Sequence, residues 1–366
     1  MKKAQQILTL VLSLGFIAVF AALFWILPNA DESTVERRHL AKSPALSFSS
    51  VASGSFMNDF ENYMLDQFPL RDGFRTLKAA ANAKVFMQKD NNGLYSVGEH
   101  LSKLDFPTDF DSVNRAAQRF RYVYDAYLKS PGVKTYLSVI PDKNVFIASP
   151  NGYPDKDYKA LVERLRNGFP EAKYIDISGL LSADDFYYTD SHWRQERITK
   201  VADEIAAQMG AERIGTCEIQ DTGRPFYGVY YGQAALPHAP ERLFYLDNAV
   251  IRGLQVYNVE TQSDIPVYDL GAAAGRDPYE MFLGGARSII KITNPNAAQE
   301  RRLIVFRDSF GSSIAPLLAA GYSEITLVDI RYISPLSLGK LIDFTKADDV
   351  LFLYSASVIN NSETIK

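Results

Sequence analysis

The sequence predicts an α/β protein whose three layers are built on a parallel sheet, preceded by one N-terminal transmembrane helix. Near the C-terminus, apolar strand-like runs alternate with helical segments, as in RRLIVFRD, SSIAPLLAAG and EITLVDI. Each of these strands is a continuous apolar run, which is typical of a parallel sheet with helices on both faces. The chain is also 47% hydrophobic, enough to build a large core.

The transmembrane helix is predicted at residues 7–27, where the run ILTLVLSLGFIAVFAALFWIL carries no charge. This run is long enough to cross a hydrocarbon core of roughly 30 Å as one helix. Lys2 and Lys3 precede it, so the positive-inside rule places residues 1–6 in the cytoplasm and residues 28–366 outside. A cleaved signal peptide has a shorter apolar core with small residues before the cut, so we expect an uncleaved anchor in the cell membrane.

The remainder of the chain divides into a tether and one folded domain. Residues 28–55 are polar and rich in Ser and Ala, which predicts a tether. The domain spans 56–366 and opens with apolar residues at helical spacing on both sides of Pro69, which predicts two helices packing on the main body. Residues 217–290, rich in Tyr and Gly, match neither helical nor strand periodicity. We interpret them as an insertion that carries substrate contacts.

Within the domain, periodicity and turn residues locate the elements of the sheet. Helices are expected at 156–168, at 196–210 with Gly210 as the C-cap, at 312–321 and at 335–347. Strands are expected at 135–140, 173–178, 301–307, 325–329 and 349–354.

Charge and cysteine content exclude two classes of function. The formal net charge is -4, so the chain lacks the basic excess that binds a polyphosphate, and nucleic-acid binding is not expected. Cys217 is the only cysteine, so an intrachain disulfide cannot form and no thiolate metal site is indicated.

Polar residues follow the strands of the sheet at the edge where α/β proteins form their sites. Ser309 follows the strand at 301–307, at a turn into a helix, where its hydroxyl can project. Asp190 and His192, in YYTDSHW, follow the strand at 173–178. A serine becomes a nucleophile when an imidazole accepts its proton and a carboxylate orients that imidazole. Ser309, His192 and Asp190 are therefore the candidate catalytic residues.

Five further residues are candidates for oxyanion or substrate contacts: Phe310, Lys143, Trp193, Gly284 and Gly285. Backbone N–H groups at the helix start, such as that of Phe310, can stabilise an oxyanion. Trp193 is expected to wall the imidazole and border an open site. Lys143 could take part, although most lysines are solvated or salt-bridged. Gly284 and Gly285 form a turn, or bring their backbone close to a ligand.

Other interpretations of the same residues stay open. Asp308 and Ser309 could simply cap the following helix, the commonest role of these residue types at such a position. Asp190 and Ser191 could likewise cap the helix that holds Glu196, with Trp193 as core packing. A divalent cation could be held by Asp184, Asp185, Asp190 and His192, but their spacing matches neither a calcium loop nor a zinc helix, so no metal is expected.

Several motifs together resemble the DHHW family of bacterial membrane-anchored proteins, which is similar to the alginate O-acetylation proteins of the SGNH hydrolase superfamily. They are DQFPLRD (66–72), SVIPDKN (138–144), YYTDSHW (187–193), FLGG (282–285) and VFRDSFGSSIAPLLAAGYSEITLVDIRYI (305–333). The resemblance covers about residues 30–366. It implies that Asp190, His192 and Ser309 form a catalytic triad.

The resemblance also implies a circular permutation, because the serine precedes the histidine in an ordinary SGNH chain and follows it here. The strands from 301–307 onwards would be the first three of the sheet, and those at 135–140 and 173–178 the last two. Two positions depart from the pattern. Ser191 stands where the family motif has its first His, and Arg307 stands where the superfamily's GDS turn has Gly.

The function implied by the resemblance is O-acetylation of a cell-envelope polysaccharide outside the cytoplasm, through an acetyl-serine intermediate and without a metal or organic cofactor. A membrane-bound O-acyltransferase is implied as the partner that supplies the acetyl group. Two alternatives remain open. One is an acetyl esterase with the same three residues, and the other is a non-catalytic glycan-binding or scaffold protein with a degenerate hydrolase fold.

Overall fold

The computed structural model describes residues 2–129 and 133–366. The chain forms two compact units, one of residues 1–92 and 231–238 and the other of residues 93–230 and 239–366. The central sheet lies in the second unit, which begins at Gly93 and not at residue 56.

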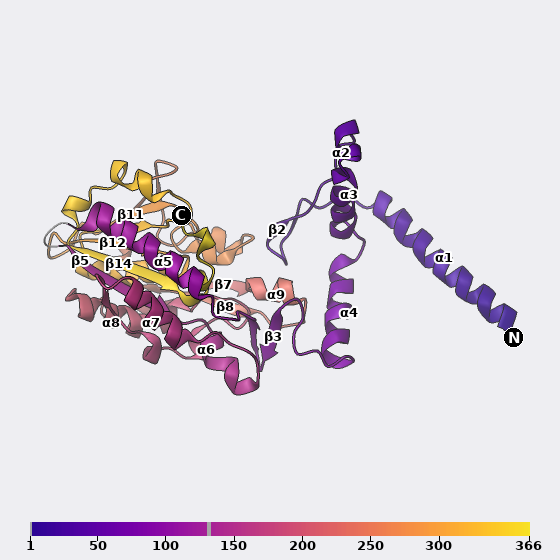
Figure 1. The fold of residues 1–366 in the computed structure, drawn as a ribbon, viewed down its shortest axis with the longest axis horizontal. Coiled ribbons are helices and arrows are strands. Elements are labelled where there is room, and N and C mark those ends of the chain that lie inside the picture. Colours follow the sequence, from indigo (N-terminus) through magenta and orange to yellow (C-terminus); the bar gives the residue numbers. More distant parts are fainter. Residues whose placement is uncertain (1, 130–132) are drawn as a thin grey trace. The chain divides into compact units, whose positions relative to one another are not determined.

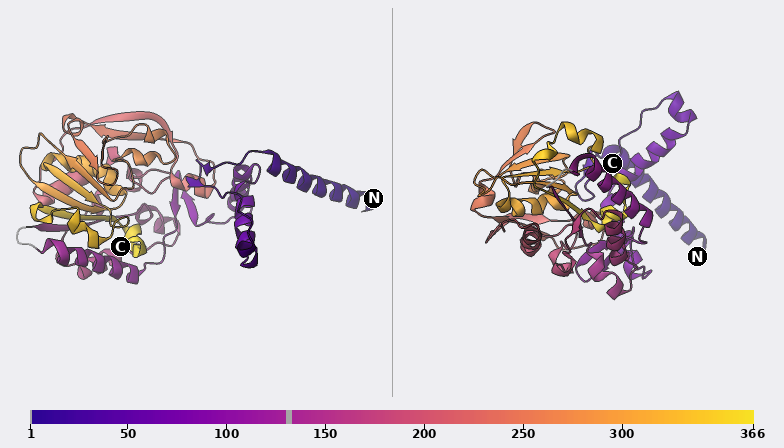
Figure 2. Two further views of the ribbon diagram at one scale, coloured as in Figure 1. Left: turned by 90° about the horizontal axis from the view of Figure 1, so that it is seen from above. Right: turned by 60° about the vertical axis from the view of Figure 1, so that its left-hand side comes forward.

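An eight-stranded sheet forms the centre of the second unit (Figures 1 and 2). Five neighbouring strands are parallel, in the order β13, β12, β14, β5, β6. Their bounds are Glu324–Val328, Arg302–Arg307, Asp349–Ser355, Lys134–Ile140 and Lys173–Tyr174. Antiparallel pairs extend the β13 edge through β11 (Ile289–Thr293), β9 (Gln255–Asn258) and β10 (Ser263–Ile265).

The strand order confirms the permuted arrangement. When β12, β13 and β14 are counted as the first three strands and β5 and β6 as the last two, the parallel order reads 2-1-3-4-5, a common doubly wound order. Parallel pairing brings the ends of β12, β14 and β5 to one edge of the sheet. Ser309 and Lys143 each follow one of these ends.

Helices cover both faces of the sheet because side chains alternate along each strand. Leu303 and Val305 of β12 belong to the core cluster on one face, whereas Ile304 and Phe306 belong to the cluster on the other. Burial of one such side chain contributes roughly 1.5–3 kcal/mol. The first cluster includes α8 (Thr199–Met209) and α11 (Phe310–Ile314), and the second includes α5 (Phe110–Val123), α7 (Tyr158–Gly168) and α12 (Ala356–Asn360). The predicted three-layer α/β fold is confirmed.

The helix predicted at 312–321 differs in type. The α-helix α11 ends at Ile314, and residues Ala315–Gly321 form a 3₁₀ helix. Pro316 has no N–H to donate to the carbonyl of Ser312, and its ring crowds that carbonyl, so the α-helix cannot continue through it.

The helix predicted at 335–347 is wrong as well. Two 3₁₀ segments, Pro335–Lys340 and Phe344–Lys346, replace it. The Tyr127 ring lies close to Gly339, where a Cβ would be 2.9 Å from the ring, and the Tyr127 hydroxyl donates to the carbonyl of Pro335 at 2.8 Å. Tertiary contacts therefore decide the conformation of this segment.

Two strand predictions also need correction. The strand expected at 173–178 is only the two residues of β6, after which Ile175 N–H donates to the Leu137 carbonyl and the chain leaves the sheet. The segment 217–290 is not a separate insertion, because β9 and β10 from it join the main sheet. It also supplies a hairpin of β7 (Glu218–Phe226) and β8 (Glu241–Asp247).

The first unit contains α1 (Lys2–Ile26), which is the one helix of the described residues long and apolar enough to cross a membrane. The expected tether is partly ordered. It contains β1 (Glu32–Ser33), β2 (Arg38–His39) and α2 (Phe48–Ala52). The two helices predicted around Pro69 are α3 (Ser55–Asp66) and α4 (Arg71–Lys84), and they belong to this unit rather than to the unit with the sheet.

The remaining strands and helices are short. They are β3 (Leu94–Val97), β4 (His100–Lys103), α6 (Asn144–Ile147), α9 (Val229–Ala234) and α10 (Ala249–Arg252).

Candidate active site

Ser309 lies in the turn between β12 and α11. The buried Asp308 carboxylate fixes this turn, because Oδ1 accepts the Phe310 N–H at 3.1 Å and Oδ2 accepts the Ser355 N–H at 2.8 Å. The second bond ties the turn to the end of β14. Asp308 therefore has a local structural role, whereas the Ser309 side chain makes no capping bond to the helix.

The Ser309 hydroxyl instead bonds to His192. The distance from Ser309 Oγ to His192 Nε2 is 2.7 Å, and that from His192 Nδ1 to Asp190 Oδ1 is also 2.7 Å. When Nδ1–H donates to the carboxylate, Nε2 carries the lone pair that accepts the serine hydroxyl. The structure thus brings the three candidate catalytic residues into one hydrogen-bonded chain.

Asp190 is fixed by further bonds to the backbone. Its side chain is fully buried, and it accepts the N–H groups of His192 at 3.1 Å and Val229 at 2.9 Å. The N-cap of α8 is Ile198, so Asp190 does not cap that helix. The His192 side chain is 14% exposed. Exposure therefore increases along the hydrogen-bonded chain, from the fully buried Asp190 to the half-buried Ser309.

Aromatic rings pack on the imidazole. The Tyr279 ring stacks on His192 at 3.9 Å between centroids, and the Phe310 ring lies 4.9 Å away. The prediction that Trp193 borders an open site is wrong. Trp193 is fully buried and its indole N–H donates to Ser313 Oγ at 2.8 Å. Because Tyr279 is distant from His192 in sequence, no local pattern could identify it as the stacking ring.

Lys143 supports the loop that carries Asp190. Its Nζ donates to three backbone carbonyls, at 2.8, 3.0 and 2.9 Å: those of Tyr187, Tyr188 and Asp190. The side chain is buried, so Lys143 is not the solvated or salt-bridged lysine that its residue type favours. An ammonium group has three N–H donors, so none is left for a substrate. Burial lowers the pKa of Lys143 to about 7, while Glu241 and Asp190 oppose this shift.

Glu241 supports the same loop through its N–H groups. Its carboxylate accepts the backbone N–H of Tyr188 at 2.7 Å and that of Thr189 at 2.8 Å. Arg194 pairs with the same carboxylate at 2.8 Å. Glu241 lies in β8 and was not identified from the sequence, because its partners are backbone groups more than fifty residues away.

Arg307 stands where the superfamily turn has Gly, and Gly311 leaves room for its side chain. The Arg307 side chain is fully buried, and a Cβ at Gly311 would lie 2.6 Å from the Arg307 Cβ. Arg307 also faces Asp329 at 3.9 Å. Burial lowers the pKa of Arg307, and Asp329 opposes this shift. Because residue 311 is Gly and has no Cβ, the aliphatic part of the Arg307 side chain fits beside it.

The FLGG segment is a turn held near β12. Gly284 and Gly285 have φ values of 69° and 74°, which glycine adopts without strain. The Gly285 carbonyl accepts an Arg307 N–H at 3.4 Å. Among the described residues, no hydrogen bond joins either glycine to Ser309 or His192. The Phe310 N–H is likewise occupied by Asp308 and is not free for an oxyanion.

The four residues considered for a metal site, Asp184, Asp185, Asp190 and His192, do not all lie together. Asp185 bonds to Ser182 and Lys200, and Asp184 faces His100 at 3.6 Å. Within the described ranges, no group of three or more His, Cys, Asp or Glu side chains is placed to hold a metal ion.

Comparison with solved structures places the fold among known proteins. A DHHW family protein from Eubacterium siraeum aligns with a TM-score of 0.60 at 20% identity, over 75% of this chain and 95% of that chain. Bacillus cereus PatB1 with a sulfonyl adduct aligns with a TM-score of 0.59 at 19% identity, over 73% of this chain and 95% of that chain. The O-acetyltransferase domain of Pseudomonas putida AlgJ aligns less well, with a TM-score of 0.46 at 13% identity, over 73% and 92%.

These matches concern the fold. No protein-family model and no curated protein matches the sequence. At identities near 20%, the first two structures show that the chain shares its fold with a DHHW family protein, as the motifs predicted, and with PatB1. The chemistry of the site depends on its own geometry.

Proposed function

We propose that this chain is an extracytoplasmic O-acetyltransferase that places acetyl groups on the hydroxyls of a cell-envelope polysaccharide. The observation that carries the proposal is the continuous Ser309–His192–Asp190 chain, with two contacts of 2.7 Å. A nucleophile, its base and the orienting group of that base are all in hydrogen-bond contact, as acyl transfer requires. The choice of acetyl as the transferred group and of a polysaccharide as the acceptor is inferred from the motif resemblance.

The first half-reaction loads the serine. His192 Nε2 takes the Ser309 proton while Oγ attacks the carbonyl carbon of an acetyl ester. The tetrahedral intermediate collapses, the bond to the leaving oxygen breaks, and His192 returns the proton to that oxygen. Asp190 holds the imidazole in the correct tautomer and stabilises its charged form.

The second half-reaction unloads the serine. A sugar hydroxyl gives its proton to His192 and attacks the acetyl-serine, which releases Ser309 with its proton restored from His192. Among the described residues, the Ser309 N–H donates to no acceptor, so it can bind the oxyanion of both intermediates. The Phe310 N–H is already used by Asp308.

The location of the reaction follows from α1, which would anchor the chain with the second unit outside the cytoplasm. Acetyl-CoA is cytoplasmic, so the acetyl group must cross the membrane before it reaches Ser309. A membrane-bound O-acyltransferase would make this transfer and is the proposed partner. A polysaccharide is the proposed acceptor because a half-buried serine remains accessible to a polymer.

The test uses the purified full chain, an activated acetyl ester and envelope oligosaccharides. Acetylated oligosaccharide should appear with the wild type and be lost with Ser309→Ala, while Ser149→Ala, an exposed serine on another segment, should retain activity. Free acetate alone, whatever acceptor is offered, would favour an esterase. Equal turnover by wild type and Ser309→Ala would contradict Ser309 as the nucleophile of either enzyme, and no turnover by the wild type would favour a non-catalytic protein.

A covalent probe tests the nucleophile separately. The PatB1 structure of similar fold contains a sulfonyl adduct. A sulfonylating reagent is therefore a suitable probe, and it should modify Ser309 in this chain and leave Ser309→Ala unmodified.

A further inference from the structure

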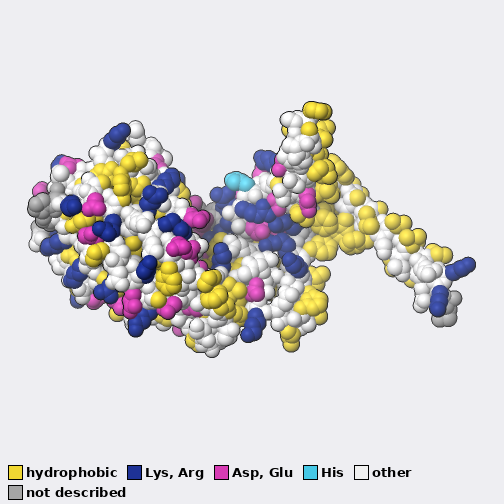
Figure 3. Space-filling model, viewed as in Figure 1, with side chains coloured by type: hydrophobic (Ala, Val, Ile, Leu, Met, Phe, Trp, Pro, Cys, Tyr) yellow, Lys and Arg dark blue, Asp and Glu magenta, His cyan; other side chains and the backbone are white. Residues whose placement is uncertain are grey.

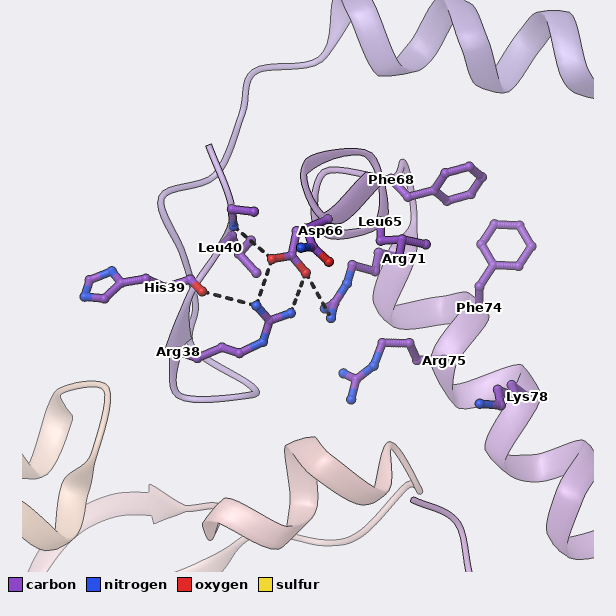
Figure 4. Close-up of a pocket in the computed structure, with 12 residues that line it drawn as sticks. Arg38, His39, Leu40, Leu65, Asp66, Phe68, Arg71, Phe74, Arg75 and Lys78 are labelled. Carbon is purple, nitrogen blue, oxygen red and sulfur yellow. Dashed lines mark hydrogen bonds and ion pairs between the residues drawn. The ribbon is translucent and has the colours of Figure 1, made fainter. Parts of the chain in front are cut away.

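A second site lies in the first unit, far in sequence from Ser309. A cavity of about 790 Å³ is lined by residues of the expected tether and of α3 and α4 (Figure 4). Two kinds of side chain meet in it. Leu65, Phe68 and Phe74 supply apolar surface, and the cationic side chains are Arg38, Arg71, Arg75 and Lys78.

Most of these cations already have anionic partners. Arg38 forms two bonds with Asp66, at 2.8 and 2.5 Å, and Arg71 and Arg75 contact Glu36 at 2.5 and 3.0 Å. These pairs fix the arginines around the cavity.

Lys78 is different. It is exposed, and among the described residues it forms no ion pair or hydrogen bond. Asp66 lines the cavity and is shared by Arg38 and Arg71. Asp72 also approaches Arg71 and Arg75, at 3.3 and 3.7 Å. The three arginines are thus matched by three carboxylates, and the positive charge available to an anion is that of Lys78.

The helix α4 has the pattern of a helix that lies at a membrane surface. Phe74 and Leu77 lie on one side of it, three residues apart, whereas Arg71, Arg75 and Lys78 follow a second side at spacings of four and three. Leu77 is 64% exposed. A basic side beside an exposed apolar side is typical of interfacial helices.

Contacts between α1 and the start of α4 indicate how deep α4 would lie in the bilayer. Phe20 of α1 stacks on Phe68 at 5.4 Å and meets the edge of Phe74 at 5.5 Å. Phe20 is six residues before Ile26, about 9 Å along the helix. If α1 spans the membrane, Phe68 and Phe74 lie beside the outer ends of the lipid chains. Figure 3 shows the hydrophobic side chains of α1 continuing onto this region beside a group of basic side chains.

We propose that this cavity binds one anionic phospholipid from the extracytoplasmic leaflet of the membrane that α1 crosses. Its phosphate would lie at Lys78, and the start of an acyl chain along Phe68 and Phe74. Phosphate is the shared chemistry of lipid headgroups and free phosphate, but the apolar wall and the contact with α1 favour the lipid. The inference rests on membrane anchorage through α1 and not on acyl transfer.

The test is native mass spectrometry of the full chain in detergent, titrated with phosphatidylglycerol, phosphatidylcholine or inorganic phosphate. One phosphatidylglycerol should bind, and more tightly than phosphatidylcholine. Lys78→Ala should weaken phosphatidylglycerol binding about fivefold, as expected for one lysine at an anionic surface. The matched control is Lys84→Ala, an exposed lysine of the same helix outside the cavity, which should bind as the wild type does.

Each other outcome counts against the proposal. Equal binding by Lys78→Ala and the wild type, or equal loss in Lys84→Ala, would contradict a site at Lys78. Equal affinity for phosphatidylcholine would contradict the anionic preference. Displacement of the lipid by inorganic phosphate at similar concentration would indicate an anion site only. Ser309→Ala should bind lipid normally, so failure here is distinguishable from failure of the proposed enzyme.

Discussion

The ring of Tyr279 lies flat against the imidazole of His192, with centroids 3.9 Å apart and planes 13° from parallel. The Tyr279 hydroxyl donates to Ser313 Oγ at 2.8 Å, which fixes the ring in its own plane. The imidazole therefore rests on a rigid surface that keeps Nε2 directed at Ser309. The Phe310 ring, from the turn after Ser309, adds a second contact to the imidazole at 4.9 Å.

Tyr279→Leu should lower kcat about tenfold with little change in KM, because the imidazole loses a stacking contact of roughly 0.5–1.5 kcal/mol and its orientation. Steady-state kinetics with an activated acetyl ester would measure both constants. Tyr279→Phe keeps the ring and loses only the hydroxyl, so it should retain most of kcat. Equal losses in the Leu and Phe variants would contradict a role for stacking.

Lys143→Met should lower kcat at least tenfold while KM changes little, because the loop that carries Asp190 loses three hydrogen bonds. Unfolding by urea should show a loss of about 1–3 kcal/mol, the cost of leaving buried carbonyls unpaired. The exposed Lys159→Met is the matched control. A loss of stability with unchanged kcat would show that Lys143 supports the fold and not the position of Asp190.

The sequence predicted β5, β12, β13 and β14 well because these strands are buried on both faces and read as apolar runs. The edge strand β6 is shorter than predicted, and its Lys173 is exposed. The meeting of Ser309 with His192 was predicted from two strands expected to end at one edge of the sheet. In the structure β6 stops at Tyr174, opposite Leu137, and His192 reaches Ser309 through the long segment that follows. Tyr279 and Glu241 were not predictable. Both lie in the segment 217–290, whose sequence shows no regular periodicity. Their contacts with the site depend on tertiary packing. Lys143 was identified as a candidate, but only the structure shows that it bonds to the backbone.

Gly311→Ala should destabilise the protein by about 1–3 kcal/mol, because its Cβ would lie 2.6 Å from the Cβ of the buried Arg307. Gly179→Ala is the matched control, since nothing lies within 4 Å of a Cβ there. Urea denaturation of both variants gives the comparison. Equal stability of the two would contradict the interpretation that Gly311 makes room for Arg307.

Stability should fall as pH decreases from about 6.5 to about 4, in part through His100. Burial, with Lys143 and Arg194 nearby, lowers the pKa of His100 to about 4, while Asp184 opposes this shift. The unfolded chain therefore binds a proton in this window that the folded chain does not, and unfolding is favoured as pH falls. In His100→Gln, the free energy of unfolding should depend less on pH between these values, and an unchanged dependence would contradict this assignment.

Direct trapping of the acyl-enzyme tests the proposed chemistry most closely. The full chain is mixed with an activated acetyl ester, quenched in acid within one turnover, digested and mapped by mass spectrometry. One acetyl group should be found on Ser309, absent from Ser309→Ala and strongly reduced in His192→Ala, because the base is lost. A wild-type chain that turns over the ester without acetyl on Ser309, or with the same label in Ser309→Ala, would contradict the serine mechanism.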